Sequence, residues 1–211
     1  MKTSRLFPTA SILLALLLLP ALAGAQDEEE RKLELFAEGG PSFYTSVSSQ
    51  FFTLFAGAFN AGSSVGTTGR LFTGARFYLN PKEALEASYA YSPNRLQNTV
   101  EPRAPFPGFF SSTSMRVHQG QFNYVRYVPW GRRGPLEPFV TAGLGFVTYA
   151  VPGNLSTKFA GNFGGGVDVR LHPRWRLRTE FRDVLAERPA RLSQPGTTHN
   201  LVPSVGVAFR F

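Results

Sequence analysis

Residues 201–211 read L-V-P-S-V-G-V-A-F-R-F, and the chain ends on an aromatic residue. Every second side chain is apolar, and those between are mostly small or polar. The apolar set is Leu201, Pro203, Val205, Val207, Phe209 and Phe211. A two-residue period with one apolar face is typical of a β-strand whose faces contact different environments. A terminal Phe beside the free carboxylate is unusual in a soluble domain. It suits a strand that closes a membrane barrel, because aromatic rings favour the membrane interface.

The first 25 residues have the pattern of a secretory signal peptide. Lys2 and Arg5 form the basic start, residues 12–19 the apolar run, and residues 23–25 (A-G-A) a small-residue cleavage site. The apolar run is too short to span ~30 Å of hydrocarbon as a helix. We therefore expect export and removal of residues 1–25. Residues 26–32 (Q-D-E-E-E-R-K) are then expected to form a charged, solvated leader.

Composition limits the rest of the chain to one class of membrane structure. The chain of 211 residues carries a net charge of +8 and has no cysteine, so disulfides and thiol chemistry are excluded. After residue 25 no apolar stretch approaches the length of a transmembrane helix. A closed barrel is the remaining way to cross a membrane, because it pairs every backbone polar group between strands. One domain is expected over residues 33–211.

Eight segments show the alternation of residues 201–211. We expect strands at 33–40, 70–79, 84–91, 115–128, 138–149, 158–171, 175–182 and 201–211. Long connections (41–68, 92–114, 185–198) and a modest one (151–157) alternate with short turns (80–83, 129–135, 172–173). In 41–68 we expect a central loop with strand extensions at each end. The four prolines of 92–114 argue against a central strand there. The pattern predicts an all-β fold, an eight-stranded antiparallel up-and-down transmembrane β-barrel.

Several stretches together resemble the broad family of eight-stranded bacterial outer-membrane β-barrels of the OmpA and OmpX type. They are G-A-R-F-Y-L-N-P with L-E-A-S-Y, P-F-V-T-A-G-L-G-F, L-R-T-E-F-R-D and V-G-V-A-F-R-F. The resemblance implies a monomer in the outer membrane of a Gram-negative-type bacterium, surrounded by outer-membrane lipid. It also implies that the barrel assembly machinery reads Val205, Val207, Phe209 and Phe211 as an assembly signal. The peptidoglycan-binding domain that follows OmpA-type barrels is not expected here.

The side chains expected to point into the barrel form a charged set. It consists of Glu34, Glu38, Arg70, Arg76, Glu86, Asp168, Arg170, Arg176, Arg178, Glu180, Arg182 and Arg210. An eight-stranded barrel is just wide enough for its side chains to fill the interior. Charges at this density must pair, and the Arg fork binds carboxylates through two hydrogen bonds. A structural network that plugs the lumen is the first interpretation. A narrow, anion-leaning pore is the alternative.

Specific binding, if any, is expected at the outer loops. Phe106, Phe109 and Phe110 lie in the second long connection, flanked by prolines, and are candidates for contact with a surface ligand or lipid. Packing on neighbouring loops is the plainer reading of the same residues.

Catalysis and cofactors find no support in the sequence. His118, His172 and His199 all lack the Ser two residues further on that lipid-A-deacylase chemistry would need. No metal-ligand spacing occurs, and Gly164 to Gly166 lack a phosphate-loop context. Arginines that alternate with apolar residues do not form a nucleic-acid stripe. We expect no enzyme, cofactor, metal or nucleic-acid partner. A soluble periplasmic ligand-binding barrel remains a further alternative.

Overall fold

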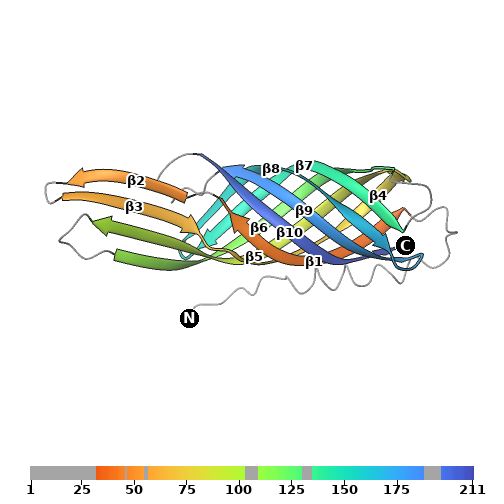
Figure 1. Ribbon diagram of the computed structural model, residues 1–211, viewed down its shortest axis with the longest axis horizontal. Coiled ribbons are helices and arrows are strands. Elements are labelled where there is room, and N and C mark those ends of the chain that lie inside the picture. Colours follow the sequence, from red (N-terminus) through yellow and green to blue (C-terminus); the bar gives the residue numbers. More distant parts are fainter. Residues whose placement is uncertain (1–31, 46, 55–56, 103–108, 130–134, 188–195) are drawn as a thin grey trace, which may run out of the picture.

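The computed structural model describes residues 32–45, 47–54, 57–102, 109–129, 135–187 and 196–211. Within these ranges no helix is long and apolar enough to cross a membrane. Eight strands form a closed barrel: β1 (Leu33–Tyr44), β4 (Thr68–Asn80), β5 (Glu83–Pro102), β6 (Phe109–Tyr127), β7 (Leu136–Val151), β8 (Asn154–Arg170), β9 (Trp175–Glu187) and β10 (Thr197–Arg210). Each pairs antiparallel with the next, and β10 pairs with β1 (Figure 1). The predicted fold is confirmed. The predicted signal peptide and nearly all of the leader lie outside the described residues.

The outer connections differ from the prediction, because much of 41–68 and 92–114 is strand. β2 (Val47–Leu54) and β3 (Gly57–Val65) form a hairpin, and β3 pairs with β5 from Leu96 to Pro102. The far parts of β5 and β6 continue to pair as well. We call β2, β3, residues 94–102 of β5 and residues 109–115 of β6 the extension. It projects beyond the barrel at the left of Figure 1.

Pro93 shows why the prolines of 92–114 do not exclude a strand in that segment. It lies inside β5, paired in register with Arg116 of β6. On the other side of β5, the β4 register ends at Tyr91 and the β3 register begins at Leu96. Proline has no N–H to donate to a neighbouring strand. It is tolerated at position 93 because β4 has ended and β3 has not yet begun, so no ladder hydrogen bond is required on that side of β5.

The expected loop at 151–157 is also wrong. β7 and β8 pair up to Val151 and Asn154, leaving a two-residue turn of Pro152 and Gly153. Gly153 has φ of 75°. Pro followed by a residue with positive φ suits a tight turn of the type II kind. The segment therefore makes a hairpin.

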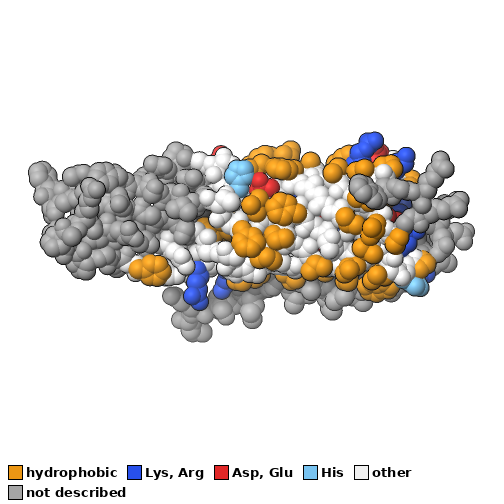
Figure 2. Space-filling model, viewed as in Figure 1, with side chains coloured by type: hydrophobic (Ala, Val, Ile, Leu, Met, Phe, Trp, Pro, Cys, Tyr) orange, Lys and Arg blue, Asp and Glu red, His pale blue; other side chains and the backbone are white. Residues whose placement is uncertain are grey.

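The outward face of the barrel is apolar. Exposed large apolar side chains include Leu71, Phe77, Leu85, Phe122, Val140, Leu144, Phe163, Phe181, Val205 and Val207. Figure 2 shows such side chains spread over the barrel wall. A water-soluble monomer rarely exposes apolar patches of this extent, whereas a lipid-facing band requires them. This face argues against the soluble periplasmic alternative.

The least regular predicted strand, 115–128, has the expected facing. In β6, Gln119, Gln121 and Asn123 are buried, whereas Phe122 and Tyr124 are exposed. Arg126 is even-numbered in β6, like Phe122 and Tyr124, and therefore points outward near the turn. Its Nη1 lies 3.0 Å from Glu83 Oε1.

Apolar side chains close the lumen at two levels. An outer cluster contains Val65, Met115, Val117, Val147, Tyr149, Ala160, Val184 and Ala186, with Tyr44 and Val151 packed against it. A second cluster near the short turns contains Tyr78, Ala84, Val125, Tyr127 and Phe139. Phe36 and Phe72 form a smaller group with Ala90 and Ala208. The charged residues lie among these groups.

The β1–β10 seam contains two prolines. Its register runs from Gly39–Val205 to Phe43–Leu201, which places Pro41 opposite Pro203. Hydrogen bonds from Phe211 N to Leu33 O and from Thr45 N to His199 O show that odd-numbered β1 residues bond across this seam. Pro41 and Pro203 therefore occupy a hydrogen-bonding position that neither can use as a donor.

Candidate functional site

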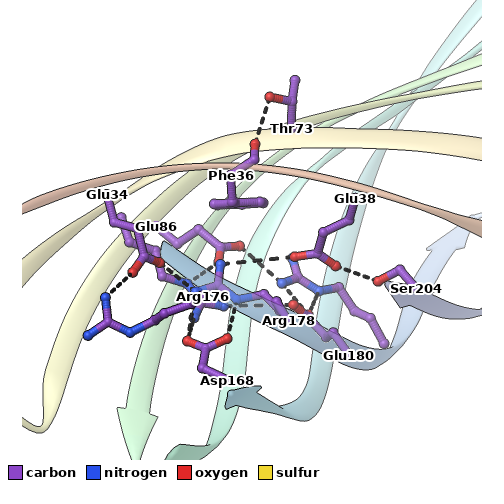
Figure 3. A network of polar contacts seen from close by, with 12 residues as sticks. Glu34, Phe36, Glu38, Thr73, Glu86, Asp168, Arg176, Arg178, Glu180 and Ser204 are labelled. Atoms are coloured by element: carbon purple, nitrogen blue, oxygen red, sulfur yellow. Dashed lines mark hydrogen bonds and ion pairs between the residues drawn. The ribbon is translucent and has the colours of Figure 1, made fainter. Parts of the chain in front are cut away.

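Within the part of the chain that the structure describes, the lumen holds five buried arginines and five buried carboxylates. They are Arg70, Arg76, Arg176, Arg178 and Arg182, with Glu34, Glu38, Glu86, Asp168 and Glu180. They come from β1, β4, β5, β8 and β9 and occupy inward positions of the two-residue alternation. Figure 3 shows the five carboxylates converging with Arg176 and Arg178 inside the barrel.

The centre of the network is Arg178. Its Nε donates to Asp168 Oδ1 at 2.6 Å and its Nη2 to Asp168 Oδ2 at 2.8 Å. The same Nη2 donates to Glu34 Oε1 at 2.5 Å. Asp168 lies directly opposite Arg178 in the β8–β9 register, so strand pairing itself positions the two-bond contact. A buried guanidinium with two carboxylates satisfies most of its donors.

Arg76 repeats this arrangement across β4 and β5. It faces Glu86 in the register, and its Nε donates to Glu86 Oε2 at 2.7 Å. Asp168 and Glu180 each lie 3.7 Å from its guanidinium. Arg182 extends the chain of contacts, since its Nη2 donates to Glu86 Oε1 at 3.0 Å and its Nε to Glu180 Oε1 at 2.5 Å. The pairs thus form one connected network.

Two tyrosines, which the charged set omitted, bridge the network. Tyr127 donates its hydroxyl to Asp168 Oδ2 at 2.8 Å and accepts from Arg76 Nη1 at 3.0 Å. Tyr78 donates to Glu34 Oε2 at 3.0 Å, and its hydroxyl lies 2.7 Å from that of Tyr127. Both tyrosines have inward parity in the sequence. Their inward positions in the two-residue alternation could have placed them in the lumen, although the predicted set contains charged residues alone.

Neutral polar residues also donate hydrogen bonds to the network, although Glu38 Oε1 and Glu180 Oε2 are buried without a hydrogen-bond partner. Asn123 Nδ2 donates to Glu86 Oε1 at 2.8 Å, and Asn162 Nδ2 donates to Asn123 Oδ1 at 2.8 Å. Ser204 Oγ donates to Glu38 Oε2 at 2.6 Å. Hydrogen bonds of this kind offset the desolvation of a buried carboxylate.

Aromatic rings stack on the central guanidinium groups. The Arg76 guanidinium carbon lies 4.3 Å from the centroid of Phe139, and that of Arg178 lies 5.0 Å from the centroid of Phe36. A cation over an aromatic face is attracted by the ring quadrupole, more strongly when both are desolvated. The inward aromatics therefore stabilise the charges and also fill the lumen around them.

Two residues of the predicted lumen set lie at its edge. Arg170, at the end of β8, is 53% exposed and pairs with Glu137, so its expected burial in the lumen is wrong. β8 ends at Arg170. A side chain on the inward side of the strand at this position lies at the mouth of the barrel. Arg210, near the end of β10, is partly buried, with its guanidinium carbon 3.8 Å from the Tyr78 ring centroid. Glu137 also pairs with Arg176 at 3.1 Å.

Arg70 is placed differently from the other buried arginines. It is 5% exposed and lies toward the outer end of the lumen in β4. Its guanidinium carbon lies 5.1 Å from the centroid of Phe72. No carboxylate of the described residues lies within 4.0 Å of it.

The aromatic candidates of the second outer connection are only partly described. Phe106 lies outside the described residues. Phe109 and Phe110 belong to β6, in register with Val100 and Thr99, and not to a loop as predicted. The Phe110 side chain is 63% exposed.

The four terminal residues singled out lie on the outward side of β10 and just beyond it. Val205 and Val207 are exposed, and Phe209 and Phe211 are partly buried. The Phe209 ring contacts Trp175 and Phe211 edge-on, with both centroid distances 4.8 Å. Aromatic rings gathered at one end of the barrel suit a membrane interface.

The histidines make isolated contacts. His118 Nδ1 lies 2.6 Å from the Tyr89 hydroxyl, and His199 Nδ1 lies 2.8 Å from Asp183 Oδ2. In the described part of the chain, no group of three or more metal-binding side chains comes together.

Comparison with known proteins identifies the kind of barrel. The family model described as "Outer membrane protein beta-barrel domain" matches residues 11–211. No curated protein matches the chain. Among solved structures, Neisserial surface protein A is similar at 16% identity, covering 85% of this chain and 97% of its own, with a TM-score of 0.53. The outer membrane protein AlkL is similar at 16% identity, covering 89% and 94%, with a TM-score of 0.50. At these identities the likeness shows the fold alone.

Proposed function

Because this chain belongs to the outer membrane β-barrel family, we propose that its barrel is a closed anchor that carries the extension to the cell surface as a binding surface. The proposal rests on the extension, in which paired strands continue past the barrel wall. Within the described residues, the outermost strands of the extension each have one side that pairs with no other strand. The barrel is assigned no catalytic role. It is proposed to act as a monomer, to be assembled through its C-terminal strand, and to lose its signal peptide on export.

The filled lumen supports an anchor more than a channel. The Arg178, Arg76 and Arg182 contacts cross the lumen at its centre, and the outer apolar cluster lies above them. An ion crossing this region would have to separate buried ion pairs, which is strongly unfavourable. The proposed function therefore lies outside the lumen.

The edges of the extension define the kind of partner. β2 is the last strand of the sheet on one side. On the other, β6 pairs with β7 only from Arg116 onward, so residues 109–115 have one free edge within the described structure. Residues 109–114 read F-F-S-S-T-S and carry no charge. An uncharged edge is open to β-addition, in which a partner in extended conformation supplies the next strand.

The β6 edge can be tested one hydrogen bond at a time. The bonds from Tyr127 N to Lys82 O and from Val128 N to Pro138 O indicate that odd-numbered β6 residues bond to β5 and even-numbered ones point to the opposite side. The Ser112 N–H therefore faces the free edge. Ser112→Pro removes this donor and leaves the β5 ladder intact, whereas Ser112→Ala keeps it.

The probe is a displayed random-peptide library, selected on the refolded protein in detergent micelles. The proposal predicts that selected peptides bind wild type and Ser112→Ala equally and bind Ser112→Pro at least ten-fold more weakly. Peptides that bind all three proteins alike would show that the β6 edge is not the binding surface.

A further inference from the structure

Four arginines of the described strands are exposed, and they differ in their partners. At the short-turn end of the barrel, Arg126 and Arg170 each pair with a glutamate. At the opposite end, Arg95 of β5 and Arg116 of β6 form no salt bridge with any described residue. Because arginine stays protonated in proteins, the outer two present permanent positive charges that no described carboxylate neutralises.

Strand pairing places Arg95 and Arg116 beside each other on the outward face. In the β5–β6 register Arg95 is opposite Ser114 and Arg116 is opposite Pro93, so the two arginines are diagonal neighbours. Both are exposed, and the residue before each is buried, so both side chains point outward. Diagonal neighbours in an antiparallel pair are about 7–8 Å apart, within reach of long side chains. The two guanidinium groups can therefore hold one anion between them.

An aromatic layer lies next to this pair, on the side toward the short turns. Tyr91 of β5 is opposite His118 of β6, and their ring centroids are 5.2 Å apart. The Tyr89 hydroxyl lies 2.6 Å from His118 Nδ1. Still closer to the short turns, the outward side chains of these strands include Leu85 and Phe122. This order, from apolar through aromatic to basic, is typical of a membrane–water interface.

On the rest of this end of the barrel, surface charges are paired. Lys158, the remaining lysine or arginine on the described surface there, lies 2.9 Å from Glu187. At the outer ends of β9 and β10, Asp183 Oδ2 lies 2.8 Å from His199 Nδ1. The unpaired positive charge of this end is therefore concentrated, among the described residues, on β5 and β6.

We infer that Arg95 and Arg116 bind a phosphate group on the headgroup of a lipid in the outer leaflet of the membrane. The planar guanidinium fork binds phosphate oxygens through two hydrogen bonds, and two adjacent forks suit a doubly charged phosphate monoester. A lipid is the source of this phosphate because the arginines lie at the edge of the apolar wall. The acyl chains of the same molecule can pack on outward side chains such as Leu85 and Phe122.

This site shares with the proposed function only the orientation of the barrel, with its short turns on the periplasmic side. It requires no partner strand at the β6 edge. Peptide binding that is unaffected by Ser112→Pro would therefore leave the lipid site standing, and loss of the lipid site would leave the β6 edge standing.

Lipid A with its phosphate groups, and the same lipid with these groups removed, are the probes. Native mass spectrometry of the refolded protein in nonionic detergent micelles measures the binding of each. Wild type is expected to bind the phosphorylated form about ten-fold more tightly, because only this form makes charge-assisted hydrogen bonds. The double variant Arg95→Gln/Arg116→Gln is expected to bind both forms alike. The matched control Arg126→Gln/Arg170→Gln removes the same charge at the short-turn end and is expected to keep the preference of wild type.

An equal loss of preference in the two double variants would show a general effect of net charge and would overturn the inference. Equal binding of the two lipids by wild type would overturn it as well, and this comparison needs no variant. Inorganic phosphate equimolar with the lipid is expected to leave the bound lipid in place. Displacement of the lipid under these conditions would show a site for free phosphate instead.

Discussion

Arg178 of β9 and Asp168 of β8 lie opposite each other in the register and share two hydrogen bonds, from Nε to Oδ1 at 2.6 Å and from Nη2 to Oδ2 at 2.8 Å. Both side chains are fully buried. Because Arg178 also bonds Glu34, this pair joins the β8–β9 wall to β1 across the barrel interior.

Removing one partner of this pair is expected to be severe. Asp168→Ala leaves two Arg178 donors without acceptors and also removes the acceptor of Tyr127. The expected loss is about 3–5 kcal/mol of unfolding free energy, the usual range for a broken buried ion pair. Urea unfolding in detergent micelles measures it.

The matched control is Glu187→Ala, which breaks the exposed pair between Lys158 and Glu187 at 2.9 Å. An exposed pair of this kind contributes about 0–1 kcal/mol. Similar small losses for both variants would mean that the central network does not stabilise the barrel.

The lipid-facing surface makes a second prediction. Leu144 lies in the middle of β7, is 59% exposed and faces outward. Leu144→Arg is expected to lower the unfolding free energy in lipid bilayers by about 2–4 kcal/mol, because a charge near the bilayer midplane is poorly solvated. Leu171, which is 64% exposed and lies just beyond the end of β8, serves as control. Leu171→Arg should lower it by only about 0–1 kcal/mol. Equal losses would place the membrane elsewhere on the barrel.

The seam between β1 and β10 makes a third prediction. Pro41 and Pro203 remove two possible ladder bonds between Gly39 and Phe43. Replacing both prolines by alanine allows these bonds to form, and the amides of Gly39 and Phe43 are expected to exchange hydrogen more slowly. The net change in stability stays small, since each added bond is worth about 0.5–1.5 kcal/mol and each lost proline returns about 0.4–1 kcal/mol of unfolded-state entropy.

Pro93→Ala, in the β5 segment that leads into the extension, is the control and should leave exchange at Gly39 and Phe43 unchanged. Unchanged exchange in the double variant would show that the prolines do not weaken the seam.

The sequence predicted the barrel well because two-residue alternation reports directly on a wall with lipid on one side and polar side chains on the other. The buried positions of Glu34, Arg76 and Arg178 follow from parity alone. Parity does not show where a strand leaves the membrane, so Arg170 was placed inside although it lies at the mouth. It also gives no sign of which inward charges meet.

The extension could not be predicted in the same way. Residues 111–114 read S-S-T-S, so the alternation with apolar residues that marks a lipid-facing wall is missing there. Proline in a sequence argues against a central strand, but Pro93 lies at a point where one neighbouring strand ends before another begins. Whether a proline fits in a strand depends on which strand lies beside it. That depends on contacts between residues far apart in the sequence, which local patterns do not show.

Single-channel recording in planar lipid bilayers shows whether the lumen is closed. Purified wild-type protein, inserted at high salt, is expected to give no discrete current steps, because the Arg178–Asp168 and Arg76–Glu86 contacts and the outer apolar cluster fill the path. Reproducible discrete steps, with a selectivity for anions that Arg178→Gln or Arg182→Gln abolishes, would show instead that the lumen is a pore.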